Sequence, residues 1–149
     1  MSILQSATTS FKVELFQAVH NFGPTSPNTF KVALYSAAAN INETTTIYSS
    51  VNEVPNGGGY TTGGNTLVIS TSPTSANNTA GVPTAFISFN NTSWTNATFT
   101  ARAALIYNFT QGNKSVAVLD FGTDKTVNND TFQIIFPTPD ANSAIVRIS

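Results

Sequence analysis

The sequence predicts a mainly β protein, an antiparallel β-sandwich or barrel with one short N-terminal α-helix. Three observations support this prediction. Short apolar stretches that alternate with polar residues recur at a spacing of roughly a dozen residues. Polar turns rich in Gly, Pro and Asn separate these stretches. Only residues 9–22 place their apolar side chains at the spacing of a helix.

Length and composition favour one folded domain. The chain has 149 residues, and we expect a single β domain over residues 1–149, with a helix at about 9–22 and a β-rich body at about 29–149. Hydrophobic residues make up 40% of the chain and charged residues only 9%. Ser, Thr and Asn take the place of the missing charge, which indicates an uncharged polar surface and not a disordered chain.

Charge and cysteine content exclude several classes of function. The net charge is −1, and the six Lys and Arg residues are scattered from Lys12 to Arg147, so we expect no nucleic-acid partner. The apolar stretches are too short for a membrane span, so we expect no membrane partner. The absence of cysteine excludes disulfides and thiol catalysis.

The predicted helix has one apolar face and ends at a Gly-Pro pair. Thr9 or Ser10 is placed to cap its start, and Gly23 with Pro24 ends it. His20 lies near the helix C-terminus, where a partly positive imidazole suits the helix dipole, so we expect it at the helix surface or in an interface. The apolar face consists of Phe11, Leu15, Ala18, Val19 and Phe22.

The hairpin at Trp94–Gly122 is the predicted centre of the fold. Both faces of its first strand are apolar, which is typical of a central strand, and a turn at Thr110–Lys114 leads into the second strand. We predict a surface loop or a hairpin tip at Ser72–Pro83 and a polar loop at Thr123–Asp130. Further strands are predicted at Thr29–Ser36, Ile47–Val54 as a short edge strand, Thr66–Thr71, Ala85–Phe89, Thr131–Pro137 and Ala144–Ile148.

The residues offer little catalytic equipment. His20 is the only histidine, and without a second His or a Cys it predicts no metal site. A Ser-His-Asp triad would need His20 as well, but the sequence has no GxSxG turn. Asp120 lies in the apolar hairpin, where we expect an ion pair with Arg102. We therefore predict a protein that is not an enzyme and has no cofactor.

The glycine-rich stretch Pro55–Gly64 does not match a phosphate-binding loop. No Lys-Ser/Thr pair follows it, and no helix pattern begins there. Tight turns with positive φ at Gly57, Gly58 and Gly59, with Tyr60 packed between the turns, are the better interpretation.

Aromatic residues next to loops leave a sugar-binding alternative open. Trp94, Tyr48 and Tyr60 lie beside predicted loops and are the side chains that would stack on a sugar ring. A core position for Trp94 is the favoured interpretation, because large aromatic side chains are mostly buried.

Several segments, taken in order, resemble a family of small structural proteins from tailed bacteriophages. The resemblance runs from about Phe11 to the C-terminus, and the combination of NEV, GGGYT, GG and TARAALIYN is specific to it. The extended Ser72–Pro83 segment departs from the family pattern. The segments are FKVALYS (30–36), YSSVNEVPNGGGYTTGGNTL (48–67), WTNATFTARAALIYN (94–108), VAVLDFGTDK (116–125), FQIIFP (132–137) and AIVRIS (144–149).

The resemblance implies a role on the virion. Its motifs are not catalytic in the family, and the role it implies is a capsid decoration or cement protein that binds the major capsid protein on the outer surface of the head. Attachment to a symmetric lattice favours a homodimer or homotrimer. A host-recognition module on a tail or head fibre that binds glycans is the alternative. The candidate interface residues are Phe11, Leu15, His20, Gly57, Gly58, Gly59 and Tyr60.

Overall fold

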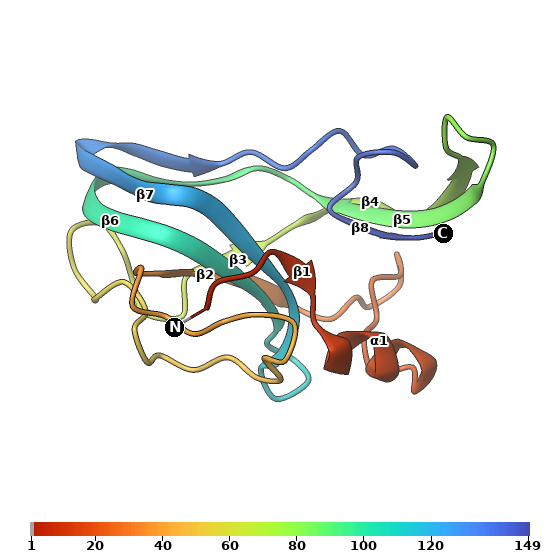
Figure 1. The fold of residues 1–149 in the computed structure, drawn as a ribbon, viewed down its shortest axis with the longest axis horizontal. Helices are drawn as coiled ribbons and strands as arrows, with labels where there is room; N and C mark the ends of the chain where they lie inside the picture. The colour runs from red at the N-terminus through yellow and green to blue at the C-terminus, as the bar shows by residue number, and fades with distance from the viewer. Residues whose placement is uncertain (1) are drawn as a thin grey trace.

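The computed structural model describes residues 2–149 and confirms the predicted fold class (Figure 1). Two antiparallel sheets, in the orders β1-β7-β6-β2-β3 and β4-β5-β8, form an arrangement consistent with a sandwich and not a closed barrel. The elements are β1 (Ser6–Ala7), α1 (Thr9–Phe16), β2 (Phe30–Tyr35), β3 (Asn65–Leu67), β4 (Ile69–Asn77), β5 (Pro83–Phe89), β6 (Thr92–Asn108), β7 (Lys114–Ile134) and β8 (Val146–Ile148).

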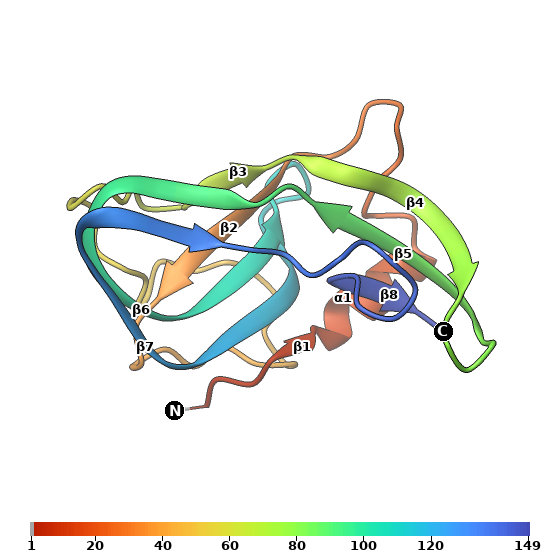
Figure 2. The same ribbon diagram turned by 90° about the horizontal axis from the view of Figure 1, so that it is seen from above.

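One long ribbon, formed by β6 and β7, organises the molecule. β6 lies between β7 and β2, which confirms the prediction of a central strand. Figures 1 and 2 show that the ribbon bends back on itself. Its register shifts between Ala101 and Ala103, and on β7 Gly122 has a φ of 76° and Asn129 a φ of 49°. Such irregularities let a strand pair bend sharply, so two parts of the same ribbon enclose the core.

Aromatic side chains fill the space inside the bend. The Trp94 ring lies 6.0 Å from the ring of Phe132 and 6.0 Å from that of Tyr60, measured between ring centroids. Phe99 and Phe132 are tilted against each other at 5.2 Å. Trp94 is 4% exposed, so its predicted position in the core is confirmed.

The prediction of a surface loop or hairpin tip at Ser72–Pro83 is confirmed for a hairpin tip at residues 78–82 and is wrong for the rest of the segment. Residues 72–77 belong to β4, Pro83 begins β5, and only residues 78–82 form the tip of the hairpin. The β4 side chains from Ser72 to Asn77 are mostly exposed, so backbone pairing with β5 holds the strand without an apolar pattern. Pro73 is tolerated because β4 is an edge strand whose register shifts between Thr71 and Thr74.

The predicted loop at Thr123–Asp130 is also wrong. These residues are the middle of β7, and the strand predicted at Thr131–Pro137 is its continuation to Ile134. The stretch is polar because most of its side chains are exposed, while its backbone pairs with β6 from Ala97 to Ala101. A cross-strand hydrogen bond of 2.8 Å joins the Thr100 and Thr126 hydroxyls. Exposure, and not loop structure, explains the composition.

Three further strand predictions need correction. The edge strand at Ile47–Val54 is absent: between residues 47 and 54 only isolated bridges form, from Ile47 to Lys114 and from Glu53 to Tyr35. The strand at Thr66–Thr71 divides at Val68, because β3 pairs with β2 while β4 pairs with β5. The chain therefore changes sheets at this residue. The strand predicted at Ala144–Ile148 is shorter, since β8 begins at Val146.

The predicted ion pair between Arg102 and Asp120 is present. Arg102 Nε lies 3.3 Å from Asp120 Oδ1, and the two side chains are 31% and 25% exposed. In a double-mutant cycle with Arg102→Gln and Asp120→Asn, we expect a coupling energy of about 0.5–1 kcal/mol that shrinks as salt is added, because solvent screens a pair this exposed. Urea denaturation of the four proteins measures it, and purely additive effects would show that the contact contributes nothing.

Candidate functional site

The helix α1, which forms one wall of an apolar groove described below, is shorter than predicted. Thr8 caps it, since the Phe11 amide donates to Thr8 Oγ1 at 3.4 Å. The helix ends at Phe16, and Ala18 has a φ of 56°. The predicted helix at 9–22 is therefore too long, because the chain turns out of the helix before the Gly-Pro pair and residues 17–22 form a connecting segment.

Apolar side chains lie on both sides of α1. Phe11 is 2% exposed and faces the core, where its ring packs edge-on against Phe22 at 6.1 Å. On the outside, Val13 is 52% exposed and Phe16 is 95% exposed. An amphipathic helix that only covers a core would carry polar residues at these positions, so the outer side of α1 has the composition of a contact surface.

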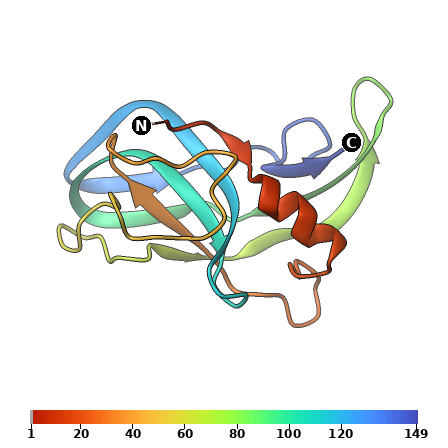
Figure 3. The ribbon, with the colours of Figure 1, turned by 60° about the horizontal axis from the view of Figure 1, so that its bottom comes forward.

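The groove itself lies between α1 and β8, which Figure 3 shows close together. Its volume is about 810 Å³, and Phe11, Leu15 and Phe16 line it from the helix. Val146 and Ile148 line it from the strand, and Ile148 is 57% exposed. An adjoining hollow of about 340 Å³ shares several of these residues and continues past His20 toward Pro73 of β4. We call these two hollows together the α1–β8 groove.

His20 is buried beneath this groove, which corrects its predicted place on a helix surface. It lies after α1, is 7% exposed, and its Nε2 is 2.8 Å from Glu14 Oε2. The Asn108 amide nitrogen is 3.0 Å from His20 Nδ1, and because an amide nitrogen only donates, Nδ1 must accept. The proton of the neutral ring is therefore on Nε2 and is donated to Glu14.

Lys114 completes this polar cluster. Its Nζ lies 2.7 Å from Glu14 Oε1, so the Glu14 carboxylate is held by Lys114 on one oxygen and by His20 on the other. Asn108 also donates to Asn28 at 2.8 Å, which ties the segment after α1 to the end of β6. We call Glu14, His20, Asn108 and Lys114 the His20 cluster; it fixes the position of α1 from below.

The pKa values in the cluster follow from burial and from these hydrogen bonds. Burial lowers the pKa of His20 below its ordinary value of 6.5, and the hydrogen bond to Glu14 opposes that shift only in part. Burial alone would raise the pKa of Glu14, but the hydrogen bonds from Lys114 and His20 together outweigh it and leave the pKa below 4.5. Both groups therefore favour the unprotonated forms in the folded protein.

Acid is expected to destabilise the fold through His20. Below about pH 6.5 the unfolded chain binds a proton that the folded chain resists, so the free energy of unfolding falls by up to about 1.4 kcal/mol per pH unit. Urea denaturation at about pH 7.5 and about pH 5.5 measures this loss. His20→Gln is the control, because it should remove the pH dependence in this range. Equal stability of the unsubstituted protein at both pH values would contradict the assignment.

The glycine-rich stretch does not join the groove. Gly57, Gly58 and Gly59 all have positive φ and Tyr60 is 2% exposed, which confirms the predicted turns around a packed tyrosine. A side chain at Gly58 would place its Cβ 2.3 Å from the Thr98 carbonyl oxygen, so glycine lets this turn lie directly on β6. The stretch serves packing, and its predicted contact role stays untested.

Glu53, which is not among the predicted site residues, holds several groups of this stretch in place by hydrogen bonds. It is 8% exposed, and its Oε1 accepts hydrogen bonds from the Tyr60 hydroxyl at 2.5 Å and from the Gly63 amide at 2.7 Å. Its Oε2 accepts from the Tyr48 hydroxyl at 2.7 Å. Tyr107 donates to the Gly63 carbonyl at 2.7 Å. We call Glu53 and these donors the Glu53 cluster.

The structure thus separates the predicted interface residues. Phe11, Leu15 and His20 converge on the α1–β8 groove, where Phe11 and His20 are buried and only Leu15 is partly exposed. Phe16, the most exposed apolar side chain, was missed. The sequence did contain a signal for Phe16: like Val13, it is an apolar residue that lies outside the predicted apolar face of the helix.

Within residues 2–149, there is no cluster of three or more His, Asp or Glu side chains that could hold a metal ion. The part of the chain that the structure describes contains no helix long and apolar enough to cross a membrane. Comparison of the chain with protein-family models, with curated proteins and with solved structures found no match.

Proposed function

We propose that this chain is a non-enzymatic structural protein of a tailed-phage virion, a decoration protein that binds the major capsid protein on the outer surface of the head. The α1–β8 groove is the proposed contact. The observation that carries the proposal is the pair of exposed apolar side chains that line this groove, Phe16 at 95% and Ile148 at 57%. A contiguous apolar surface of this kind typically marks a protein–protein contact.

The motifs that resemble phage structural proteins support the proposal. Their residues have folding roles: Glu53 of NEV holds three hydrogen-bond donors, Tyr60 of GGGYT is packed in the core, and TARAALIYN is the buried half of β6. A protein whose most distinctive residues maintain a rigid β scaffold fits a structural role. The proposal includes a homodimer or homotrimer, which light scattering tests directly.

The glycan-binding alternative receives no support from the aromatic residues on which it rested. Trp94 and Tyr60 are buried, and the partly exposed Tyr48 is stacked on Tyr107 at 4.6 Å with its hydroxyl bonded to Glu53. Of these three aromatic rings, none lies open for a sugar to stack on. We therefore do not adopt this alternative.

The decisive variant is Phe16→Ser. Complete burial of a Phe side chain in an interface contributes about 1.5–3 kcal/mol, so Phe16→Ser is expected to weaken binding to capsids that lack the protein by about tenfold to a hundredfold. Val51→Ser is the matched control, because Val51 is 70% exposed but lies outside the groove. Cosedimentation with purified capsids measures the binding. Equal binding by the two variants would exclude the groove as the contact.

Virion imaging tests the proposed location. A decoration protein is expected as a regular array over the head, at a copy number that follows the capsid lattice. A few copies confined to the tail would contradict the proposal, whatever the effect of Phe16→Ser.

A further inference from the structure

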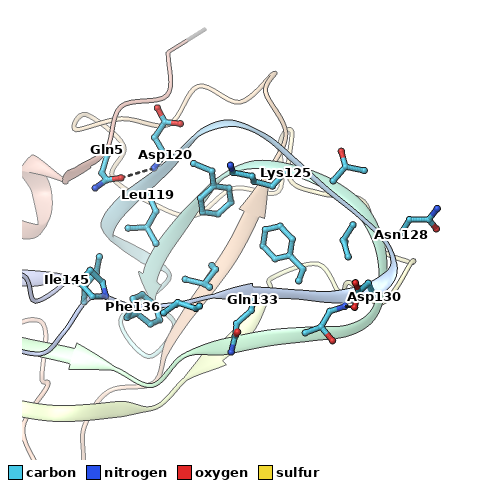
Figure 4. A pocket seen from close by; sticks show the side chains of 17 residues that line it. Gln5, Leu119, Asp120, Lys125, Asn128, Asp130, Gln133, Phe136 and Ile145 are labelled. Atoms are coloured by element: carbon cyan, nitrogen blue, oxygen red, sulfur yellow. Dashed lines mark hydrogen bonds between the residues drawn. The ribbon is translucent and has the colours of Figure 1, made fainter.

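A second hollow lies inside the bend of β7, away from α1. Its volume is about 670 Å³, and Figure 4 shows it between the two arms of the strand, with Leu119 on one side and Phe136 on the other. Leu119, Phe132 and Phe136 are each 7–9% exposed. The residual exposure of these core side chains is toward this opening, because all three line the hollow.

The wall of the hollow is the backbone edge of a strand. Every residue from Asp130 to Pro137 lines it, although Phe132 and Ile134 point into the core while Gln133 is exposed and points away from the hollow (Figure 4). Successive side chains of a strand point to opposite faces of the sheet, so one face contributes only every second residue to a cavity wall. A wall that every successive residue lines is therefore formed by the edge of the strand. The backbone edge of the strand therefore contributes to this wall, together with polar side chains such as those of Asp120 and Lys125.

This edge of β7 has no neighbouring strand beyond Val118. β6 pairs with the opposite edge over the whole length of β7, whereas β1 pairs only with Ala117 and Val118. Within residues 2–149, no other strand of the sheet lies next to β7. An unpaired edge is a template for another strand, and natural proteins usually cover it.

The Gln5 side chain bonds to the first backbone amide of this edge after the pairing with β1 ends. The Asp120 amide donates to the side-chain oxygen of Gln5 at 3.4 Å, where the carbonyl of a neighbouring strand would otherwise accept. Leu4 has already left the edge, since its amide donates to the Ile41 carbonyl at 3.2 Å. Side chains also satisfy two later amides of this stretch, since Gly122 donates to Asp120 Oδ1 at 2.8 Å and Thr131 to Asp130 Oδ1 at 2.7 Å. Within residues 2–149, no strand pairs with this edge beyond Val118, so a partner strand would compete only with these side chains.

The charges along this edge indicate what kind of segment would add to it. The stretch from Leu119 to Ile134 carries Asp120, Asp124 and Asp130 but only one cation, Lys125. Arg102 of β6 neutralises Asp120 at 3.3 Å, and the part of the chain that the structure describes provides no salt-bridge partner for Asp130. With Lys125 and Arg102 set against these three carboxylates, one net negative charge remains, and it favours a partner segment with Lys or Arg.

We propose that the free edge of β7 binds an extended, basic segment of another protein as an added strand, with its apolar side chains in the hollow between Leu119 and Phe136. Main-chain hydrogen bonds to the edge would supply affinity, and alternate side chains in the hollow would supply specificity. This inference does not depend on the α1–β8 groove or on a role in a capsid.

The test uses a capped hexapeptide of alternating Val and Lys as the probe. Amide hydrogen exchange of the full chain should slow within residues 131–135 when the peptide is added, because the added strand covers their edge. The same peptide with alternate backbone nitrogens methylated cannot donate the ladder bonds and should bind at least about tenfold more weakly. A peptide of alternating Val and Glu should also bind at least about tenfold more weakly at low salt.

Asp130→Lys should weaken binding of the basic peptide by at least about fivefold, whereas the control Glu43→Lys makes the same charge change at an exposed site outside the hollow and should not. Three results would overturn the proposal: no binding of the basic peptide, equal binding of the methylated peptide, or protection of the edge by a second copy of the chain without any peptide. Each of these leaves the Phe16→Ser experiment unaffected, so failure here is separable from failure of the proposed function.

Discussion

Gly64→Ala is expected to lower the free energy of unfolding by more than about 4 kcal/mol, or to prevent folding altogether. A Cβ at this position would lie 1.8 Å from the Val32 carbonyl oxygen and 2.8 Å from Ala33 Cα. These are backbone atoms of β2, a buried strand held by β3 on one side and β6 on the other. β2 cannot shift without breaking its backbone hydrogen bonds to β3 or β6, so the clash cannot be relieved at a small cost in free energy.

Gly112→Ala is the matched control for this variant. Gly112 has a φ of 67° and Gly64 a φ of 68°, but a Cβ at Gly112 would have no atom within 4 Å. The left-handed backbone alone should therefore cost about 1–2 kcal/mol in Gly112→Ala. Urea denaturation followed by Trp94 fluorescence measures both variants. If their losses were equal, the close approach to β2 would not explain the glycine.

The central part of the β6–β7 ribbon was predictable because the pattern of apolar residues in its sequence matches the burial of its side chains. Apolar residues on both faces from Ala101 to Tyr107 predict a strand covered on both sides, and β6 has that place in the sheet. The outer part of the same ribbon was not predictable in this way. From Thr123 to Thr131 nearly every side chain is exposed, and a polar strand held by backbone pairing has the composition of a loop.

The His20 cluster could not be predicted because its members are distant in sequence. Asn108 and Lys114 contact His20 and Glu14 only because the ribbon returns beside α1. The end of α1 could not be predicted either. Ala18 adopts a positive φ, a conformation usually occupied by Gly or Asn after a helix. Because the helix is six residues shorter than predicted, His20 lies in the segment after it and is buried, instead of on a helix surface.

The α1–β8 groove was predictable only in part. The apolar positions of residues 9–22 predict a buried face, and Phe11 confirms it. Phe16 and Val13 lie off that face, so their apolar character had no explanation within a single chain. An apolar residue outside the predicted core face is the sequence signal for a contact surface, and it identifies Phe16 better than residues chosen from the buried face.

The Glu53 cluster leads to the second large expected effect. Glu53→Ala removes a buried carboxylate that accepts hydrogen bonds from two tyrosine hydroxyls and from the Gly63 amide, and leaves all three donors without their acceptor. Each unsatisfied buried donor costs about 1–3 kcal/mol, so we expect a total loss of about 3–5 kcal/mol, part of which water entering the cavity offsets.

Glu53→Gln separates hydrogen bonding from charge in this cluster. Its amide oxygen can still accept from Tyr60 and Gly63, and its amide nitrogen can donate to the Tyr48 hydroxyl, so a loss of only about 1–2 kcal/mol is expected. Urea denaturation compares the two variants. A loss from Glu53→Gln as large as that from Glu53→Ala would show that the negative charge, and not the hydrogen-bond geometry, maintains the cluster.

Alkaline titration provides an independent measure of the same cluster. Burial, with a smaller contribution from the Glu53 charge, raises the pKa of Tyr107 to about 12. Burial and the nearby Glu53 carboxylate also raise the pKa of Tyr60 and of Tyr48, whose hydroxyls donate to Glu53. A raised pKa gives stability that is complete below about pH 10 and is lost as the pH rises toward the folded value. Tyrosine ionisation, followed by ultraviolet absorbance, should therefore coincide with unfolding. In Glu53→Gln the loss of the nearby negative charge should lower these pKa values, and unchanged titration would contradict the role assigned to Glu53.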